Sequence, residues 1–142
     1  MKKHFSTKNV VDFLKFNEFT NIKLIEQHEA VDDFSVTAAN DRSYYVYASN
    51  FSMSIFNKKG VVANLSIDWQ DYLCQVQPGY PELLVQSLEK KLDDKEFLYK
   101  QDKKLNGISL ESLKDHNAGM ETIVTRIENI KRKYNLDNNL KT

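Results

Sequence analysis

The amino-acid sequence predicts an α+β protein, in which an N-terminal helix precedes an antiparallel meander of five to six strands and two to three C-terminal helices. Two observations predict this order. Apolar residues alternate with polar ones through the middle of the chain, whereas towards its end they recur every three to four positions. Charged residues follow the same division, since residues 30–80 carry eight of them and residues 81–142 carry 23. The length of 142 residues indicates a single domain spanning residues 1–142.

The pattern near the N-terminus predicts a helix over residues 8–18. Val10, Phe13 and Leu14 fall on one face at helical spacing. Ser6 or Thr7 stands before them, and a hydroxyl there can accept a hydrogen bond from a free backbone N–H of the first turn.

The alternation predicts an antiparallel sheet over residues 20–77. Its five segments are 22–24, 34–38, 44–48, 51–55 and 61–67. Short runs of Asn, Asp and Gly separate them, and Gly60 can take the positive φ of a hairpin bulge. Because the connections are short, neighbouring strands should pair antiparallel. Tyr72, Cys74 and Val76 also alternate, which permits a sixth short strand over 72–76.

Helical spacing returns over residues 81–134. Pro81 suits the first position of a helix, where its missing N–H costs nothing. This helix is expected over residues 81–92, with a further turn or two through Tyr99. Its apolar residues are Leu84, Val85, Leu88 and Leu92. Residues 100–107 are polar and are expected to form a linker.

A last helix is expected after Ser109, which can cap it. Its apolar residues form a heptad seam made of Leu113, Met120, Ile123, Ile127, Ile130 and Tyr134. Ala118 and Gly119 are expected to kink or break this helix. Residues 135–142 are expected to form a frayed tail.

The composition argues against several classes of protein. Twenty basic residues balance twenty acidic ones, and only three are Arg, which disfavours nucleic-acid binding. No apolar run approaches the roughly 18 residues of a membrane span. A lone Cys74 cannot close an intramolecular disulfide, so that a soluble, cytoplasmic protein is expected. Abundant Lys, Asn and Ile with scarce Arg, Gly and Pro favour a bacterial or phage origin.

No catalytic residue, cofactor site or metal-ligand motif emerges from the spacing. His4, His28 and His116 lie far apart, and none has a second histidine at i+3 or i+4. They are interpreted as surface or boundary residues, the alternative being that the fold joins His28 and His116 to a carboxylate. Cys74 is expected to be a buried small apolar residue. The glycines are isolated, which leaves no phosphate-binding loop.

Asp68 and Asp71 flank Trp69 with a spacing that allows two interpretations. Two carboxylates around an aromatic ring have the composition of a sugar or amine site. An ordinary acidic turn between strands has the same composition, and the turn is favoured.

The outward face of the predicted sheet is the most informative surface. If the inward residues are Phe34, Val36, Tyr44, Val46, Met53, Ile55, Leu65 and Ile67, the outward ones are Thr37, Tyr45, Tyr47, Ser52, Ser54, Phe56, Asn64 and Ser66. None of the outward residues is charged, and aromatic rings among small polar groups are typical of binding surfaces. Alternatively, another layer of the same chain covers this face.

These observations support three hypotheses of function. The first is a non-enzymatic interaction protein, homodimeric through the sheet face or through Met120, Ile123, Ile127, Ile130 and Tyr134. In the competing interpretation, that seam packs on the chain's own sheet. The second is a protein that binds a nucleotide-like or aromatic small molecule with Tyr45, Tyr47, Phe56 and Trp69. The third and weakest is a hydrolase that uses Asp68 and Asp71.

Overall fold

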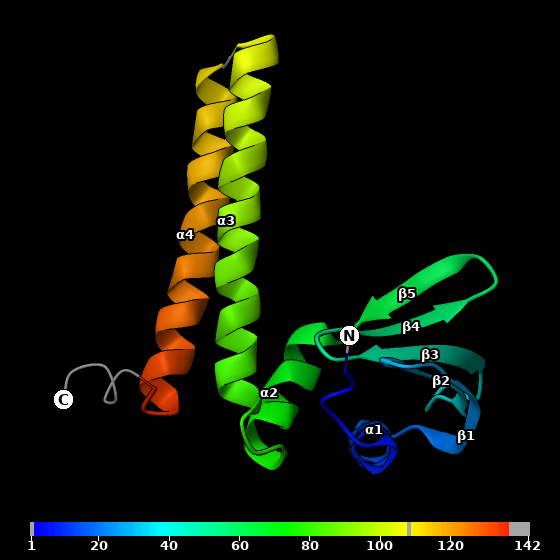
Figure 1. Cartoon of the computed structure of the whole chain (residues 1–142). Coiled ribbons are helices and arrows are strands. Elements are labelled where there is room, and N and C mark those ends of the chain that lie inside the picture. Colours follow the sequence, from blue (N-terminus) through cyan, green and yellow to red (C-terminus); the bar gives the residue numbers. More distant parts are fainter. Residues whose placement is uncertain (1, 108, 137–142) are drawn as a thin grey trace. The chain divides into compact units, whose positions relative to one another are not determined.

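The structure, a computed structural model, describes residues 2–107 and 109–136 (Figure 1). Its elements are α1 (Thr7–Phe16), β1 (Thr20–Gln27), β2 (Val31–Thr37), β3 (Ser43–Ser49), β4 (Met53–Asn57), β5 (Gly60–Asn64), α2 (Ser66–Val76), α3 (Tyr80–Asn106) and α4 (Leu110–Lys133). This order confirms the α+β class, with one N-terminal helix, five antiparallel strands and three following helices. The chain forms two compact units, Met1–Tyr80 and Pro81–Thr142. Most of the tail expected to fray, residues 137–142, lies outside the described residues.

The first helix begins where the sequence predicts. Ser6 is its N-cap: the Ser6 hydroxyl accepts a hydrogen bond from the Asn9 backbone N–H, and the Asn9 side chain accepts one from the Ser6 N–H. This reciprocal arrangement satisfies two donors that a helix start otherwise leaves free. Val10, Phe13 and Leu14 form the buried face of α1.

The five strands form one sheet in the order β1-β2-β3-β4-β5, with every neighbouring pair antiparallel. One face of the sheet is buried, and its residues are Phe34, Val36, Val46, Ala48, Met53 and Ile55. Helix α1 contacts β1, and α2 contacts β4. Gly60 has the positive φ expected of it, +132°, at the turn between β4 and β5.

Residues 66–76 are a helix, so the sixth strand predicted over 72–76 is wrong and the sheet ends at Asn64. Leu65, Trp69 and Leu73 recur every four positions, which places them on one side of α2. Trp69 and Leu73 are fully buried there. Ile67, expected to point inwards from a strand, is instead 53% exposed on the outer side of α2.

Trp69 lies at the centre of the core of the first unit. Its ring packs edge-on against Phe5 and Phe13, with centroids 5.5 and 5.3 Å away, and stacks on Tyr72 at 6.0 Å. The indole N–H donates a hydrogen bond of 2.8 Å to the carbonyl of Ser49 in β3. A single side chain therefore joins the N-terminal segment, both helices and the sheet.

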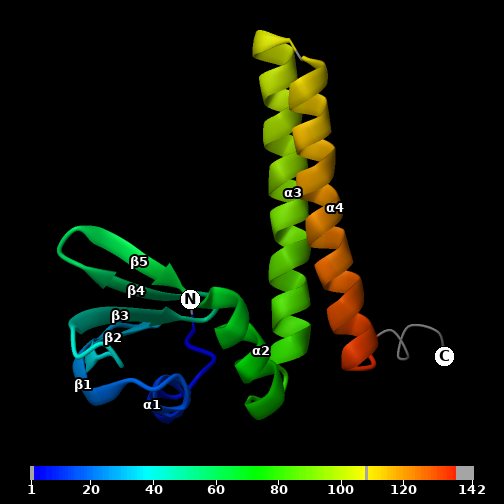
Figure 2. The ribbon, with the colours of Figure 1, turned by 180° about the vertical axis from the view of Figure 1, so that it is seen from behind.

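Helices α3 and α4 of the second unit run side by side in opposite directions (Figure 1 and Figure 2). Helix α3 continues to Asn106, so the linker expected over 100–107 is wrong. Pairs one turn apart support this extension, with Glu96 near Lys100 (3.8 Å) and Asn106 donating to Asp102 (2.7 Å). Ser109 caps α4 as expected, by accepting a hydrogen bond from the Ser112 N–H.

Helix α4 is continuous through Ala118 and Gly119, so the kink or break expected there is wrong. A Cβ on Gly119 would lie 2.8 Å from Cε of Lys95, a residue of α3. The missing side chain thus accommodates the aliphatic part of Lys95 between the helices, which gives the glycine a packing role inside a helix.

Candidate functional site

The outward face of the sheet carries three of the four aromatic residues that were predicted to bind a ligand. Tyr45 and Phe56 are directly opposite each other on β3 and β4, with ring centroids 5.8 Å apart. Tyr47 lies two positions along β3, opposite Ser54. Tyr45 is 43% exposed and Tyr47 is 41% exposed. Among the described residues of the first unit, no helix is therefore packed over the two tyrosines.

Trp69, the fourth predicted contact, does not belong to this face. It is fully buried in the core on the other side of the sheet. The cause is the secondary structure: on α2 its side chain points towards α1 and the buried sheet face, whereas a strand and turn had been expected. The structure thus brings Tyr45, Tyr47 and Phe56 together without Trp69.

The C-terminal seam is covered within one copy of the chain. Ile123, Ile127 and Ile130 are buried, and Met120 and Tyr134 are half-buried. Contacts between α3 and α4 accompany them: the Tyr99 and His116 rings stack with centroids 3.8 Å apart, and Lys131 lies 4.0 Å from Glu89. Leu113, the first residue of the predicted seam, is 38% exposed, and the other exposed large apolar residues of these helices are Phe97, Leu98, Leu105, Leu110 and Val124.

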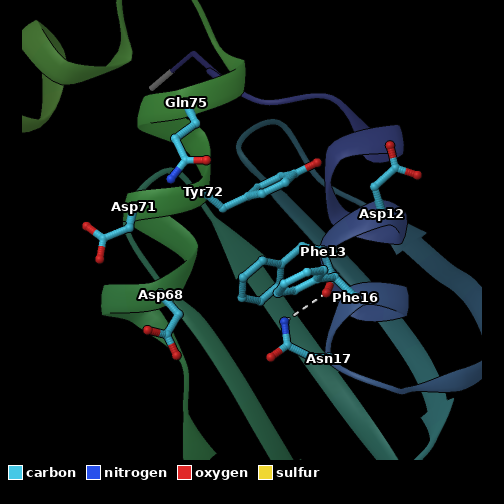
Figure 3. Close-up of a pocket in the computed structure, with 8 residues that line it drawn as sticks. All are labelled: Asp12, Phe13, Phe16, Asn17, Asp68, Asp71, Tyr72 and Gln75. Carbon is cyan, nitrogen blue, oxygen red and sulfur yellow. Dashed lines mark hydrogen bonds between the residues drawn. The ribbon is translucent and has the colours of Figure 1, made fainter. Parts of the chain in front are cut away.

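A groove with a volume of about 680 Å³ lies between α1 and α2 of the first unit (Figure 3). Its lining residues are Asp12, Phe13, Phe16, Asn17, Asp68, Asp71, Tyr72 and Gln75. Tyr72 extends from α2 towards α1, and the rings of Phe13 and Phe16 lie between the two helices (Figure 3). Phe16 is 85% exposed, which makes it the most exposed large apolar side chain of the described residues.

The charges of the groove are all negative. Asp12 on α1 and Asp68 and Asp71 on α2 contribute three carboxylates, and none of the Lys, Arg or His residues that the structure describes lines the groove. Lys8 stands one turn before Asp12 on α1, and its ammonium donates a 2.7 Å hydrogen bond to the Asp12 carboxylate. That bond and the Asp12 charge raise the pKa of Lys8 above its usual value. Lys8 therefore stays protonated at neutral pH and compensates part of the Asp12 charge.

Sequence reasoning found only part of this groove. Asp68 and Asp71 had been considered as an amine or sugar site, but Asp12 and Phe16 had not been connected with them. The exposed Phe16 carried a signal, because it follows Phe13 by three positions at the end of an amphipathic helix. The distance between α1 and α2 depends on how the five strands between them in the chain are arranged. That distance cannot be read from the sequence.

His28 and His116 each lie beside a carboxylate of their own compact unit. His28 Nε2 lies 3.2 Å from Asp33 Oδ2 and 3.7 Å from Glu26 Oε2. His116 Nε2 lies 3.2 Å from Glu96 Oε2 across α3 and α4. The two carboxylates near His28 do not stand at the i+3 or i+4 spacing of a helical metal site. Glu26 stands at i−2, and Asp33 lies on the neighbouring strand. Cys74 is buried, as expected.

Comparison of the chain with protein-family models, curated proteins and solved structures finds no significant match. Among the described residues, no helix combines the length and the apolar character needed to cross a membrane.

Proposed function

We propose that the protein is a non-enzymatic, cytoplasmic interaction protein, and that the groove between α1 and α2 accepts a cationic side chain on a partly apolar segment of a partner protein. The observation that supports this most directly is the lining of the groove. Three aromatic rings and three carboxylates from two helices line it.

The chemistry of these residues selects for a cation with an apolar stem. The face of an aromatic ring attracts Lys or Arg by about 0.5–1 kcal/mol at an exposed site. A carboxylate adds a charge-assisted hydrogen bond, and with Arg it can form two parallel ones. The aliphatic part of Lys or Arg would cover Phe16, whose ring otherwise stands in water.

The test is a titration of the full chain with a fluorescent peptide that carries Leu between two Arg residues. A second peptide with citrulline, the neutral isostere of Arg, serves as the ligand control. We expect the Asp68→Asn, Asp71→Asn double variant to bind the Arg peptide roughly tenfold more weakly, because two charge-assisted contacts are lost. Asp41→Asn, an exposed acid in the turn after β2, is the matched protein control.

A further variant should act in the opposite direction. Lys8→Met removes the cation that competes for Asp12, and it should strengthen Arg-peptide binding only about twofold, because water screens an exposed ion pair. Equal binding of the citrulline peptide, or unchanged binding by the double variant, would contradict the proposed function. Retained binding together with turnover of a hydrolysable substrate would instead favour the hydrolase hypothesis for Asp68 and Asp71.

The exposed pair Tyr45 and Tyr47 supports a second candidate function, binding of a flat small molecule against the sheet. An uncharged face with Tyr45 beside Phe56 offers ring area together with hydroxyl groups. Adenosine monophosphate is a suitable probe for a nucleotide-like ligand. The shift in melting temperature that it causes should disappear in the Tyr45→Ser, Tyr47→Ser variant. Tyr44→Phe, on the opposite face of β3, is the control, and an unchanged shift in the double variant would exclude this face.

Self-association is proposed through the exposed residues of the helical hairpin instead of through its buried seam. Leu98 and Leu105 are 65% and 80% exposed and stand seven positions apart on α3, the spacing of helices that pair along their length. Sedimentation equilibrium of the Leu98→Gln, Leu105→Gln variant should give a lower mass than that of the unchanged chain. Identical masses for the two would remove this surface from consideration.

A further inference from the structure

Three potential metal ligands converge at the end of the hairpin that joins β1 and β2. Glu26 lies in β1, His28 follows that strand, and Asp33 lies in β2. Glu26 and Asp33 are directly opposite each other in the antiparallel register. The His28 N–H donates a 2.8 Å hydrogen bond to the carbonyl of Val31, which fixes the backbone that carries the imidazole.

The separations between donor atoms suit a shared ion. His28 Nε2 lies 3.2 Å from Asp33 Oδ2 and 3.7 Å from Glu26 Oε2, and all three donor atoms lie within 4.8 Å of one another. Imidazole nitrogen and carboxylate oxygen bind Zn²⁺ at about 2.0–2.2 Å, which places two ligands of a tetrahedral site about 3.4 Å apart. Glu26 is exposed, so that its side chain has room to adjust and bring the third donor closer to that separation.

The electrostatics of the hairpin also favour a cation at this position. Like charges directly opposite each other on paired strands destabilise a sheet. Glu26 and Asp33 are such a pair, and His28 is the partner that the described structure gives to both carboxylates. A neutral imidazole leaves this repulsion in place, whereas a divalent ion bound by the imidazole and both carboxylates removes it.

We propose that Glu26, His28 and Asp33 form a binding site for a divalent transition-metal ion of the Zn²⁺ class. One nitrogen and two carboxylate donors suit Zn²⁺ and its neighbours better than Mg²⁺ or Ca²⁺, which prefer all-oxygen sites. Three protein ligands leave at least one coordination position open to water or to a group on a partner.

The bound ion would fasten an edge strand to the sheet. Strand β1 has a neighbour on one side only, is largely exposed and departs from regular pairing with β2 at two places. Because the ligands come from β1, the turn and β2, the ion would link the two strands where the hairpin closes. Metal binding should therefore raise the melting temperature as well as produce a binding signal.

The experiment uses the full chain without a purification tag, so that no added histidines bind metal. Calorimetric titration with Zn²⁺ should show one saturable equivalent, and Co²⁺ should give the visible absorption of a bound ion. His28→Ala and Asp33→Asn should each weaken Zn²⁺ binding at least about tenfold and abolish the rise in melting temperature. Glu29→Gln, an exposed acid in the same turn outside the cluster, should leave the affinity within about twofold.

Four outcomes would overturn the proposal. They are an absence of saturable Zn²⁺ binding, equal binding by His28→Ala and the unchanged chain, an equal loss with Glu29→Gln, and Mg²⁺ affinity as high as that for Zn²⁺. The side chains of His28 and Asp33 are 49% and 30% exposed, so neither belongs to the core, and a far-UV circular dichroism spectrum of each variant separates lost binding from lost folding.

Discussion

The two compact units of the chain are built from different chemistry. Residues 1–80 contain 13 of the 16 aromatic residues, whereas residues 81–142 contain three aromatic residues and 23 of the 40 charges. In the first unit, rings from separate elements surround Trp69. In the second, Ile123, Ile127 and Ile130 repeat along one side of a helix. The first unit therefore depends on contacts between residues distant in sequence, and the second on a short pattern repeated along two helices.

This difference indicates which of the two units can form a binding site from residues that are distant in sequence. A sheet and helices joined by turns bring side chains from many positions to one place, which is how Asp12 and Asp68 come to line one groove and how Glu26 comes to lie opposite Asp33. A pair of helices presents instead a line of side chains in sequence order. We accordingly propose specific binding sites on the first unit and association along the exposed apolar residues of the second.

The largest effect is expected from Trp69→Ala. This change removes the largest buried side chain and its hydrogen bond to Ser49, so that the free energy of unfolding of the first unit should fall by about 3–5 kcal/mol. Denaturant titration followed by near-UV circular dichroism and by NMR spectra measures this loss. Phe16→Ala is the control, because an 85% exposed ring should cost less than about 0.5 kcal/mol.

Trp69→Ala also tests whether the two units are stabilised independently of each other. If the helical hairpin is stabilised by its own seam, a large part of the far-UV helical signal should survive when the first unit unfolds. Simultaneous loss of all helical signal would show that the two units unfold as one cooperative structure.

The second-largest loss of stability is expected from breaking the ion pair between Lys3 and the buried Asp32. Asp32 is fully buried, and its carboxylate contacts the Lys3 ammonium at 2.9 Å and accepts a hydrogen bond from the Thr7 hydroxyl. Lys3→Met leaves that carboxylate buried without a cation, which should cost about 3 kcal/mol. Asp32→Asn should cost about 1–2 kcal/mol, because the Lys3 side chain is 20% exposed and can turn to water. Urea denaturation measures the free energy of unfolding of both variants. Equal losses in Lys3→Met and Asp32→Asn would contradict this prediction.

The hairpin provides the matched comparison for this pair. Lys100 and Glu96 form an exposed ion pair one turn apart on α3. Lys100→Met should change the free energy of unfolding by less than about 0.5 kcal/mol, because water screens that pair. A cost near that of Lys3→Met would remove the distinction between the two units.

A buried seam residue of the hairpin should have an intermediate effect. Ile127→Ala leaves a cavity between α3 and α4 and should cost about 2 kcal/mol, near the lower end for such changes because two helices can close on the space. Thermal unfolding followed by far-UV circular dichroism measures it. Val124→Ala, three positions before Ile127 and 38% exposed, should cost less than half as much. Equal effects would place the seam on the wrong side of α4.

The smallest effect compares the turns of the two units. Gly60 and Gly107 both have positive φ, at +132° and +73°, and open space where a side chain would start. Asn accepts the left-handed region near Gly107 but not the backbone of Gly60. Gly60→Asn should therefore lower the free energy of unfolding by about 1–2 kcal/mol, and Gly107→Asn should lower it by about a few tenths of a kcal/mol. A reversed order in calorimetry would refute this account of the turns.

The strands were predictable from the sequence because one face of the sheet is buried and the other is not. Phe34 and Val36, like Val46 and Ala48, alternate with polar residues, and a period of two identifies both the strand and its inward side. The failure over residues 66–76 has an equally physical cause. Tyr72, Cys74 and Val76 alternate, while Leu65, Trp69 and Leu73 keep helical spacing, and packing of Trp69 against α1 decides between the two patterns.

The candidate sites were less predictable than the fold. Asp68 and Asp71 stand close in sequence and could be noticed, but the groove also requires Asp12 and Phe16 from another helix. The opposition of Glu26 and Asp33 depends on the length of the turn and on an irregularity between Leu24 and Glu26. A one-residue slip would turn one of the two side chains to the other face, and no local preference of these residues fixes that register.

Trp69 is the only tryptophan of the chain and lies in the first unit, shielded from water and held by the Ser49 carbonyl. Its fluorescence is therefore an intrinsic optical probe of that unit, and no indole of the helical hairpin contributes to the signal. Emission from a shielded indole lies at shorter wavelength than emission from a hydrated one. The wavelength of the emission can thus report the unfolding of the first unit without any label.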